Sequence, residues 1–507
     1  MPSPVQMIEW TKVVQPNYWF VAPELIVMLT MLIIMIADFY TKEKRALVWA
    51  TVGGLALAAI SVWYSAVGVP DIAEALAKGT PKEFFGGMLV ADQFTFFMKA
   101  VLLMVAALVT MLSMDYVARF LKGMHLEFYE VLLSATLGMM IMVSSRDLVA
   151  IYVGLELNSI CSYVLAGLLR KDPKSNEAAL KYFLNGALAS AVLLFGVSLL
   201  YGATGTTHLA EMAQQLATKA LDPGFLSFLV TGVLFVAGGF AFKVAAVPMH
   251  LWAPDAYEGA PTPVTGFFSV GPKGAGFAAL LRVFVVGLGV APLAERWSMV
   301  WAILATASMF YGNITALLQT NIKRMMAYSS IAQAGYILVG VVAAGSLTTD
   351  KGVSSVLYYI LAYALTNLGI FAILTHLDQE GGWVNVEDFK GLVKRNPFYA
   401  WTLLACFASL IGIPPFVGFF GKFFLFNAAL TANYLWLALV MAVNSVISVG
   451  YYYGVVKAMF LDESDKGALT PSTGVMATVV LSLAGVVLVG LVSSYIIPIT
   501  DAAALLR

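Results

Sequence analysis

Long apolar runs recur along this chain about every 25 to 35 residues, and each is long enough to cross a bilayer as a helix. The 507 residues are 60% apolar and only 11% charged. A water-soluble surface of this size needs roughly 25% charged residues. Because a spanning helix needs about 20 apolar residues, we expect about 14 spans. The sequence therefore predicts an all-α polytopic membrane protein.

The first apolar run is too long for the apolar core of a signal peptide and lacks a small-residue cleavage site behind it, so we expect a retained helix. Short polar connections separate the runs, and no long soluble domain is indicated. We expect the spans to begin near Val21, Leu47, Phe94, Val131, Leu148, Ala178, Phe225, Val264, Met299, Met326, Val356, Tyr399, Tyr434 and Val475.

Composition also excludes several classes of function. The formal net charge is zero, with 29 basic and 29 acidic residues, which argues against a nucleic-acid partner. Cys161 and Cys406 lie far apart and the four histidines are scattered, so we expect no disulfide framework, iron-sulfur motif or zinc site. The sequence has no phosphate-binding glycine loop, so nucleotide chemistry is expected on another chain.

The placement of lysine and arginine predicts an orientation, because cytoplasmic loops carry an excess of these residues. If the N-terminus faces outside, most loop cations fall on inner loops, and we therefore expect both termini outside. The inner group is Lys42, Lys44, Arg45, Arg119, Lys122, Arg170, Lys171, Lys174, Lys323, Arg324, Lys390, Lys394, Arg395, Lys457 and Lys466.

Charged side chains inside the apolar runs indicate where function lies, because each costs about 2.5–3.5 kcal/mol at the bilayer centre. Glu156 is the one clear carboxylate in the middle of a run. It either pins two helices together or takes part in ion movement. The cations inside the runs are Lys99, Lys181, Lys243, Lys273, Arg282 and Lys422.

Helix breakers flank two of these lysines. Lys243 lies between Gly238-Gly239 and Pro248, and Lys422 follows Pro414-Pro415. Breakers beside a buried cation free backbone carbonyls and make room for water, which suits an ion path better than a packing contact. Two interrupted spans in corresponding halves also indicate an internal repeat and a transport site.

Three further residues are candidates. Lys273 follows Gly271-Pro272 in the next span. His250 lies beside a span end, where a lone histidine is as often structural as a proton carrier. Lys181 lies near the start of its run and could instead extend its amine to the membrane interface.

This set of residues favours protons over sodium. A low-dielectric surrounding favours the neutral forms of lysine and of carboxylic acids, so both can exchange protons near neutral pH. A sodium site would need several carboxylates or carbonyls converging on one point, and the runs hold one clear carboxylate.

Three stretches carry a resemblance over nearly the whole chain. Residues 240–265 read FAFKVAAVPMHLWAPDAYEGAPTPVT, residues 413–422 read IPPFVGFFGK, and residues 22–25 read APEL. The first run resembles the signature of the antiporter-like subunits of respiratory complex I and of the multisubunit cation/proton antiporters. The APEL opening, the EGAPTPVT run and a lysine at 422 resemble the bacterial N-type subunits of that complex, the NADH-quinone oxidoreductase.

The resemblance implies a fold with two inverted five-helix repeats, each carrying a discontinuous helix. The implied divisions are residues 1–130 for the first three helices, 131–290 for the first repeat, 291–465 for the second repeat, and 466–507 for the last helix.

The resemblance also implies roles in a proton relay. Glu156 resembles the family's switch glutamate, paired with Lys243 on the first broken helix. Lys273 resembles the central relay lysine, and Lys422 the residue near the exit. Pro272 should disrupt the helix of Lys273 locally, which puts the position of that lysine in doubt.

Two residues complete the implied relay. His250 matches a histidine often found in the connecting axis, and Lys181 a second lysine near the Glu156 pair. Quinone reduction elsewhere would change the charge next to Glu156, and the change would pass along the lysines as a series of proton transfers.

The resemblance places all redox chemistry on other chains. It implies no cofactor here, with FMN, iron-sulfur clusters and quinone held by other subunits of the complex. The implied partners are the lipid bilayer, K-type and M-type neighbours and the lateral helix of the L-type subunit, in a bacterial cytoplasmic (inner) membrane.

Three other interpretations remain open. The same fold serves in sodium/proton antiporter assemblies, which are driven by an ion gradient without redox subunits. A related photosynthetic complex passes electrons from ferredoxin to plastoquinone. A membrane scaffold without transport is the third, and there lysine-to-methionine changes at 243 and 422 would leave flux intact.

Overall fold

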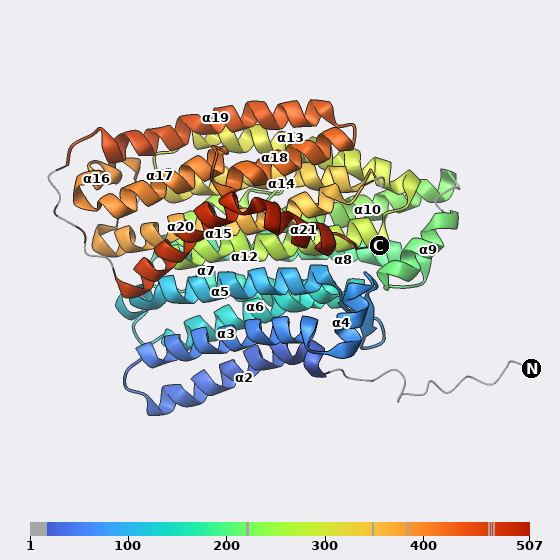
Figure 1. The fold of residues 1–507 in the computed structure, drawn as a ribbon, viewed down its shortest axis with the longest axis horizontal. Coiled ribbons are helices and arrows are strands. Elements are labelled where there is room, and N and C mark those ends of the chain that lie inside the picture. Colours follow the sequence, from blue (N-terminus) through green and yellow to red (C-terminus); the bar gives the residue numbers. More distant parts are fainter. Residues whose placement is uncertain are drawn as a thin grey trace, which may run out of the picture.

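The computed structural model describes residues 18–219, 223–346, 349–382, 385–464, 467, 469 and 472–506. Long helices lie side by side along one axis (Figure 1). Among the described residues, 13 helices are long and apolar enough to cross a membrane. They are α2 (Tyr18–Tyr40), α3 (Arg45–Val67), α5 (Gln93–Phe120), α6 (His125–Ser144), α7 (Leu148–Ala166), α8 (Pro173–Thr204), α10 (Pro223–Lys243), α12 (Thr262–Leu281), α13 (Ala291–Ala316), α14 (Ile322–Ala344), α15 (Lys351–Gly381), α19 (Leu435–Phe460) and α20 (Thr473–Leu491).

Shorter elements complete the fold. Two short apolar helices, α17 and α18, together make one further interrupted span, so the predicted all-α polytopic fold with about 14 spans is confirmed. The short elements are α4 (Pro70–Ala77), α9 (Leu209–Lys219), α11 (Trp252–Gly259), α16 (Leu392–Arg395), α17 (Pro397–Ile411), α18 (Val417–Thr431), α21 (Ser493–Ala503), the π-helix η1 (Arg282–Gly287), the 3₁₀ helix η2 (Val386–Phe389), and the strands β1 (Lys82–Phe84) and β2 (Leu89–Ala91).

Several helices begin at an aspartate or asparagine whose side chain accepts a hydrogen bond from a backbone N–H of the first turn. Such a cap satisfies donors that have no partner inside the helix. The short polar connections therefore mark the helix starts in the sequence as well as in the structure. The capping residues are Asp92 (α5), Asp147 (α7), Asp172 (α8), Asn321 (α14) and Asn396 (α17).

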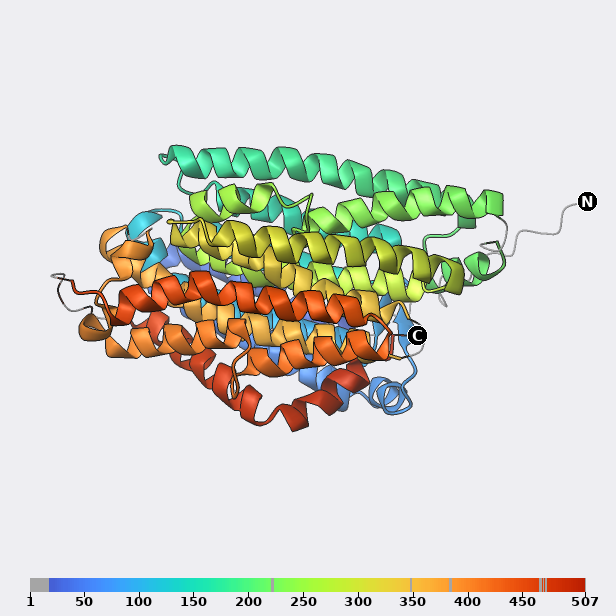
Figure 2. The ribbon, with the colours of Figure 1, turned by 90° about the horizontal axis from the view of Figure 1, so that it is seen from above.

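The two ends of the bundle differ in how many loop lysines and arginines they carry. We call the end that carries the α7–α8, α13–α14 and α15–α17 connections the basic end, because most loop lysines and arginines lie there. α2 begins and α21 ends at the opposite, terminal end (Figure 1). α20 and α21 run obliquely across the other helices both in that view and from above (Figure 2).

The strands at the terminal end were not expected. β1 and β2 form an antiparallel hairpin in the connection between α4 and α5. Leu89 forms an isolated bridge with Ser145, so the hairpin is tied to the connection between α6 and α7. These strands are three residues long and carry no period that would separate them from a polar loop.

Two spans are interrupted where the glycines and prolines predict. α10 ends at Lys243, and α11 begins only at Trp252, whose indole N–H donates to the Phe242 carbonyl at 3.0 Å. α17 ends at Ile411 and is closed by Gly412, whose φ of 95° lies in the left-handed region that favours glycine.

One expectation about the backbone is wrong. α12 runs without interruption from Thr262 to Leu281 and contains Pro272. Proline removes only one backbone donor, and every residue of α12 is buried, so packing on all sides holds the helix together. Lys273 therefore occupies a regular helical position.

Candidate functional site

Lys243 ends α10 at the edge of the first break. Its amine donates to the side-chain oxygen of Asn158 at 2.6 Å and to the hydroxyl of Ser159 at 2.9 Å, both on α7. Its side chain also lies against α12, since a Cβ added at Gly276 would come within 3.0 Å of the Lys243 Cγ. Lys243 is thus held between α7 and α12 by neutral partners.

Glu156 lies on α7, two residues before Asn158, and does not pair with Lys243 directly. Its carboxylate accepts a hydrogen bond from Ser190 of α8, and the residue is only half-buried. The expected ion pair between Glu156 and Lys243 is therefore absent between these two described residues. A rotation of about 100° per residue separates Glu156 from its neighbours on the helix, and Asn158 and Ser159 take the positions that face Lys243.

Lys273 lies inside the bundle on α12. Its amine donates to the carbonyl of Ser330 at 3.2 Å and to the hydroxyl of the same residue. The amine also lies 5.7 Å from the centre of the Tyr257 ring, whose hydroxyl is 3.0 Å from the Ser330 hydroxyl. A small cavity beside Lys273 is bounded by Phe277 and Tyr363.

Lys422 lies on α18, after the second break. Its amine donates to the carbonyl of Ile411, the last residue of α17, at 3.1 Å and to the Ser445 hydroxyl at 3.0 Å. The negative end of the α17 dipole favours a cation there. Lys243 precedes its break and Lys422 follows its own, so the two lysines do not occupy equivalent positions.

α14 joins Lys273 to Lys422 through a polar face that the sequence analysis missed. Ser330, Gln333 and Tyr336 are spaced three residues apart and share one side of this buried helix. Ser330 contacts Lys273, and the Lys422 amine lies 4.3 Å from the centre of the Tyr336 ring. In the sequence, the regular spacing of these polar residues in an otherwise apolar run could have indicated this polar face.

Gln333, between them, makes hydrogen bonds through both ends of its side-chain amide. Its side-chain oxygen accepts from the Tyr359 hydroxyl, and its amide donates to the Leu410 carbonyl at 3.4 Å. The Tyr336 hydroxyl accepts from Asn313 at 3.0 Å. Lys243, Lys273 and Lys422 are 4%, 3% and 7% exposed, so this row of polar groups runs through the interior.

Two sequence candidates are not members of this row. Lys181 has a side chain that is 45% exposed, and it forms ion pairs with Glu177 at 2.6 Å and Asp255 at 2.7 Å. His250 lies in the first break, is buried, and places its ring 4.6 Å from the ring of Tyr311.

The other two intramembrane cations are ion-paired. Lys99 is fully buried and lies 2.7 Å from Glu24 on α2. Arg282 donates through two nitrogens to both oxygens of Asp92, each at 2.8 Å. Neither carboxylate partner was a sequence candidate, because α2 reads as an ordinary apolar run and Asp92 as a loop residue.

The described residues offer no evident metal site. No group of three or more histidine, cysteine, aspartate or glutamate side chains gathers within the part of the chain that the structure describes. Cys161 and Cys406 are both buried free thiols. The candidate site is a row of amines, hydroxyls and amides joined by hydrogen bonds.

Sequence comparisons identify relatives over nearly the full chain. Residues 145–448 match the family described as "NADH:quinone oxidoreductase/Mrp antiporter, TM". The NADH-quinone oxidoreductase subunit N 2 of Symbiobacterium thermophilum is 65% identical over 486 residues, 95% of each chain. Subunit N 1 of Herpetosiphon aurantiacus is 41% identical over 498 residues, 97% of this chain and 95% of its own.

Two solved structures have a similar fold. A chain of respiratory complex I from Thermus thermophilus is 30% identical with a TM-score of 0.78, covering 95% of this chain and 99% of its own. A chain of the Mrp complex from a Dietzia species shares the fold at 21% identity, with a TM-score of 0.80 over 95% and 96% of the two chains. This chain therefore belongs to the NADH:quinone oxidoreductase/Mrp antiporter transmembrane family, among the subunit N members of complex I.

Proposed function

We propose that this chain is a proton-translocating membrane-arm subunit of an NADH:quinone oxidoreductase. The observation that carries the proposal is the set of three buried lysines, none of which forms an ion pair among the described residues. The subunit names of the relatives support the assignment to this oxidoreductase.

The cost of burying a charge explains why unpaired lysines fit proton transfer. A buried ammonium without a counter-ion costs several kcal/mol, so these side chains can lose a proton and persist as neutral amines. Their partners are hydroxyl, carbonyl and amide oxygens, which accept from either form of the amine. Each lysine can therefore hold a proton and pass it on without a rearrangement of the helices.

The proton path we infer runs from Lys243 past Gly276 to Lys273 and then along α14 to Lys422. Glu156 is half-buried and accepts a hydrogen bond from Ser190 of α8, where a neighbouring subunit could change its charge. Such a change would act on Lys243 through the electric field and through Asn158, since no direct ion pair has to break.

His250 and Lys181 have supporting roles in this proposal. His250 lies in the break next to the row, where it can exchange a proton with water. Lys181 and Arg324 hold Asp255 of α11 at 2.7 and 2.8 Å, so we assign Lys181 the positioning of this half-helix rather than proton transfer.

We infer the repeat boundaries at residues 131–290 and 291–465 from two matching connections. Asp147 caps α7 and bridges His208 after α8, while Asn321 caps α14 and bridges Asn385 after α15. The first connection lies at the terminal end and the second at the basic end, as expected for inverted repeats. Residues 1–130 and 466–507 then flank the repeats.

We propose that the basic end faces the cytoplasm and both termini face outward, in a bacterial inner membrane. K-type and M-type subunits would flank this chain, with the lateral helix of the L-type subunit along it. FMN, iron-sulfur clusters and the quinone site would belong to other subunits.

The assembled complex, purified in mild detergent from native membranes, tests this function. We expect flavin, iron and NADH-dependent quinone reduction to co-purify with this chain, and proteoliposomes of the complex to pump protons. Lys243→Met should abolish pumping in a fully assembled complex. An assembly without redox centres, or undiminished pumping by the variant, would contradict the proposal.

A further inference from the structure

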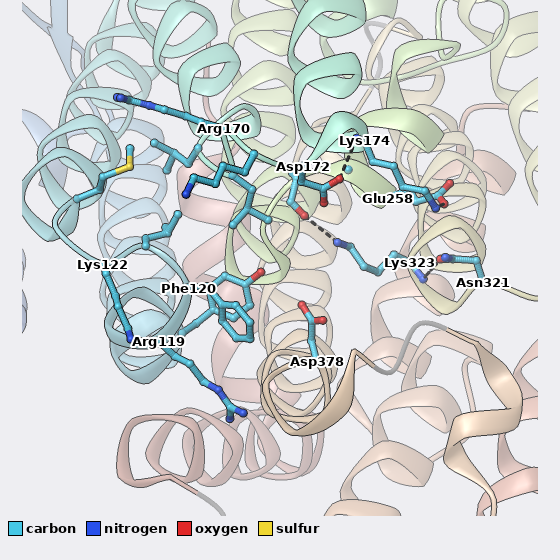
Figure 3. A pocket seen from close by; sticks show the side chains of 18 residues that line it. Arg119, Phe120, Lys122, Arg170, Asp172, Lys174, Glu258, Asn321, Lys323 and Asp378 are labelled. Atoms are coloured by element: carbon cyan, nitrogen blue, oxygen red, sulfur yellow. Dashed lines mark hydrogen bonds and ion pairs between the residues drawn. The ribbon is translucent and has the colours of Figure 1, made fainter.

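A large cavity opens at the basic end, apart from the buried row. It has a volume of about 820 Å³ and lies between the ends of α5, α7 and α15 and the starts of α6, α8, α12 and α14. Phe120, Met124 and Leu168 form apolar parts of its wall, and Figure 3 shows the side chains that surround it.

The floor of the cavity is the joint between α11 and α12. Lys323 is buried and donates to the carbonyl of Ala260 at 2.7 Å. Asp378 directs its carboxylate into the cavity (Figure 3) and accepts a hydrogen bond from Thr262, the first residue of α12, at 2.6 Å. Water in the cavity thus reaches a carboxylate at the head of the helix that carries Lys273.

α12 carries a row of hydroxyls from this floor to Lys273. Thr262, Thr265, Ser269 and Lys273 follow at intervals of three, four and four residues and so share one face of the helix. Successive members lie about 4.5 to 6 Å apart along the axis, a gap that one water molecule can bridge. All four are buried, so the row lies inside the protein.

The row also meets the α14 partner of Lys273. The Thr265 hydroxyl donates to the Tyr257 carbonyl at 3.0 Å, and the Tyr257 hydroxyl lies 3.0 Å from that of Ser330. Ser330 in turn accepts from Lys273. The Tyr257–Ser330 pair therefore holds the Lys273 amine beside the α12 row, which is the polar route to this lysine from the cavity side.

We propose that this cavity is the water entrance of the proton path and that Asp378 takes up the proton at its floor. The inference rests on the proposed proton translocation. Hydronium gives a proton to the Asp378 carboxylate and leaves water. The carboxylic acid then passes a proton through the hydroxyls and bridging waters to the neutral Lys273 amine, and the carboxylate is restored.

The charges around the cavity fit a proton better than an anionic ligand. Arg119 and Arg170 line the mouth but point away from its centre (Figure 3), so they do not converge on a bound anion. The lining holds six cations and three carboxylates, which gives a net positive field that disfavours sodium and other metal cations. A proton can enter along the hydroxyls of α12, because hydroxyl groups pass protons along hydrogen bonds, a route that a metal ion cannot follow.

The experiment is proton pumping by the assembled complex in proteoliposomes, measured against the pH of the compartment that the basic end faces. Asp378→Asn should lower the rate roughly tenfold at alkaline pH. The deficit should shrink as that compartment is acidified, because uptake then depends less on a carboxylate. Asp378→Glu should restore the rate. A rate equal to that of the wild type at every pH would overturn the proposal.

Asp172→Asn is the matched control, because Asp172 lines the same cavity but caps α8 by accepting from the Lys174 N–H at 2.9 Å. We expect it to pump normally. If Asp378→Asn fails to assemble, Thr262→Val should slow pumping and Thr262→Ser should not, and equal rates in these two would overturn the hydroxyl route.

Lys273→Met distinguishes a failure of the proposed entrance from a failure of the proposed function. If it abolishes pumping while Asp378→Asn and Thr262→Val pump normally, the entrance is wrong and the proposed function stands. If Lys273→Met also pumps normally, the proposed function itself fails.

Discussion

Two sets of buried cations share this bundle, and they differ in what they contact. Lys99 and Arg282 each lie against a carboxylate, whereas the amines of Lys243, Lys273 and Lys422 donate to neutral oxygens and pair with no carboxylate among the described residues. Burial makes a charge costly in both sets. The first set offsets that cost with an opposite charge, and the second can offset it by losing a proton.

The pair Arg282–Asp92 shows what a permanent charge requires. Burial alone would raise the pKa of Asp92, but the charge and hydrogen bonds of Arg282 outweigh it and hold that pKa below its usual value. Arg282 also donates to the Val143 carbonyl at 2.8 Å and to Thr95 at 2.6 Å. Arg282 thus makes four hydrogen bonds, which suits a structural joint between α5, α6 and the end of α12.

The largest expected effect comes from breaking this joint. Arg282→Met leaves the Asp92 carboxylate buried without its partner, which costs about 3–5 kcal/mol. We expect little assembled complex in the membrane, measured by native gel and immunoblot. The double change Arg282→Met with Asp92→Asn should recover part of the assembly, and the absence of any recovery would contradict a charge-based cause.

Lys273→Met tests the other set. Methionine fills a similar volume, and replacing a buried charge by an apolar group is often neutral for stability, so the complex should assemble normally. Proton pumping should fall by about a hundredfold or more, because the site can no longer hold a proton. Normal assembly combined with normal pumping would place Lys273 in the structural set.

Substitution by arginine tests which of the two sets of cations must lose a proton, since a guanidinium does not lose its proton in proteins. Lys422→Arg should lower pumping by roughly tenfold, whereas Lys99→Arg beside Glu24 should leave it within about twofold. Both variants are assayed at equal content of assembled complex. If both lose pumping to the same degree, Lys99 also exchanges protons and the two sets are not distinct.

The smallest expected effect comes from a change at the contact between Lys243 and α12. Gly276→Ala adds a Cβ 3.0 Å from the Lys243 Cγ, which must move the lysine side chain by a few tenths of an ångström. Pumping should fall a few-fold, on the order of 1 kcal/mol in the barrier. Gly238→Ala is the control, because its Cβ would make an ordinary 3.6 Å contact with Val192. A larger loss in the control would rule out the contact as the cause.

Much of the architecture could be predicted because bilayer thickness sets helix length directly. Both breaks contain the expected prolines, since proline disturbs a helix without help from its neighbours, whereas Gly238 and Gly239 lie inside α10. Pro272 is an exception, because it lies inside a continuous helix. Its helix is buried on every side, and tertiary packing holds the backbone that the local sequence would weaken.

The candidate site was only partly predictable. The sequence identified three lysines that the structure buries, but it placed Glu156 against Lys243 and Lys181 near both. The structure gives Lys243 to Asn158 and Ser159, and leaves Lys181 half-exposed with Asp255. Successive residues of a helix point about 100° apart, so a difference of one or two positions changes which neighbour a side chain meets. An almost uniformly apolar helix has too little contrast between its faces for the sequence to fix the helix's rotation.

The sequence by itself determined that the chain spans a membrane, where its spans break, and which ionisable groups it carries into the apolar interior. These are local properties, because they follow from the apolar length and residue types of each segment. Only the tertiary structure decided which buried cations meet a carboxylate and which do not, and that α14 links Lys273 to Lys422. Those outcomes depend on how helices distant in the sequence rotate and align against one another, and small residues such as Gly276 let them approach closely enough for the contacts to form.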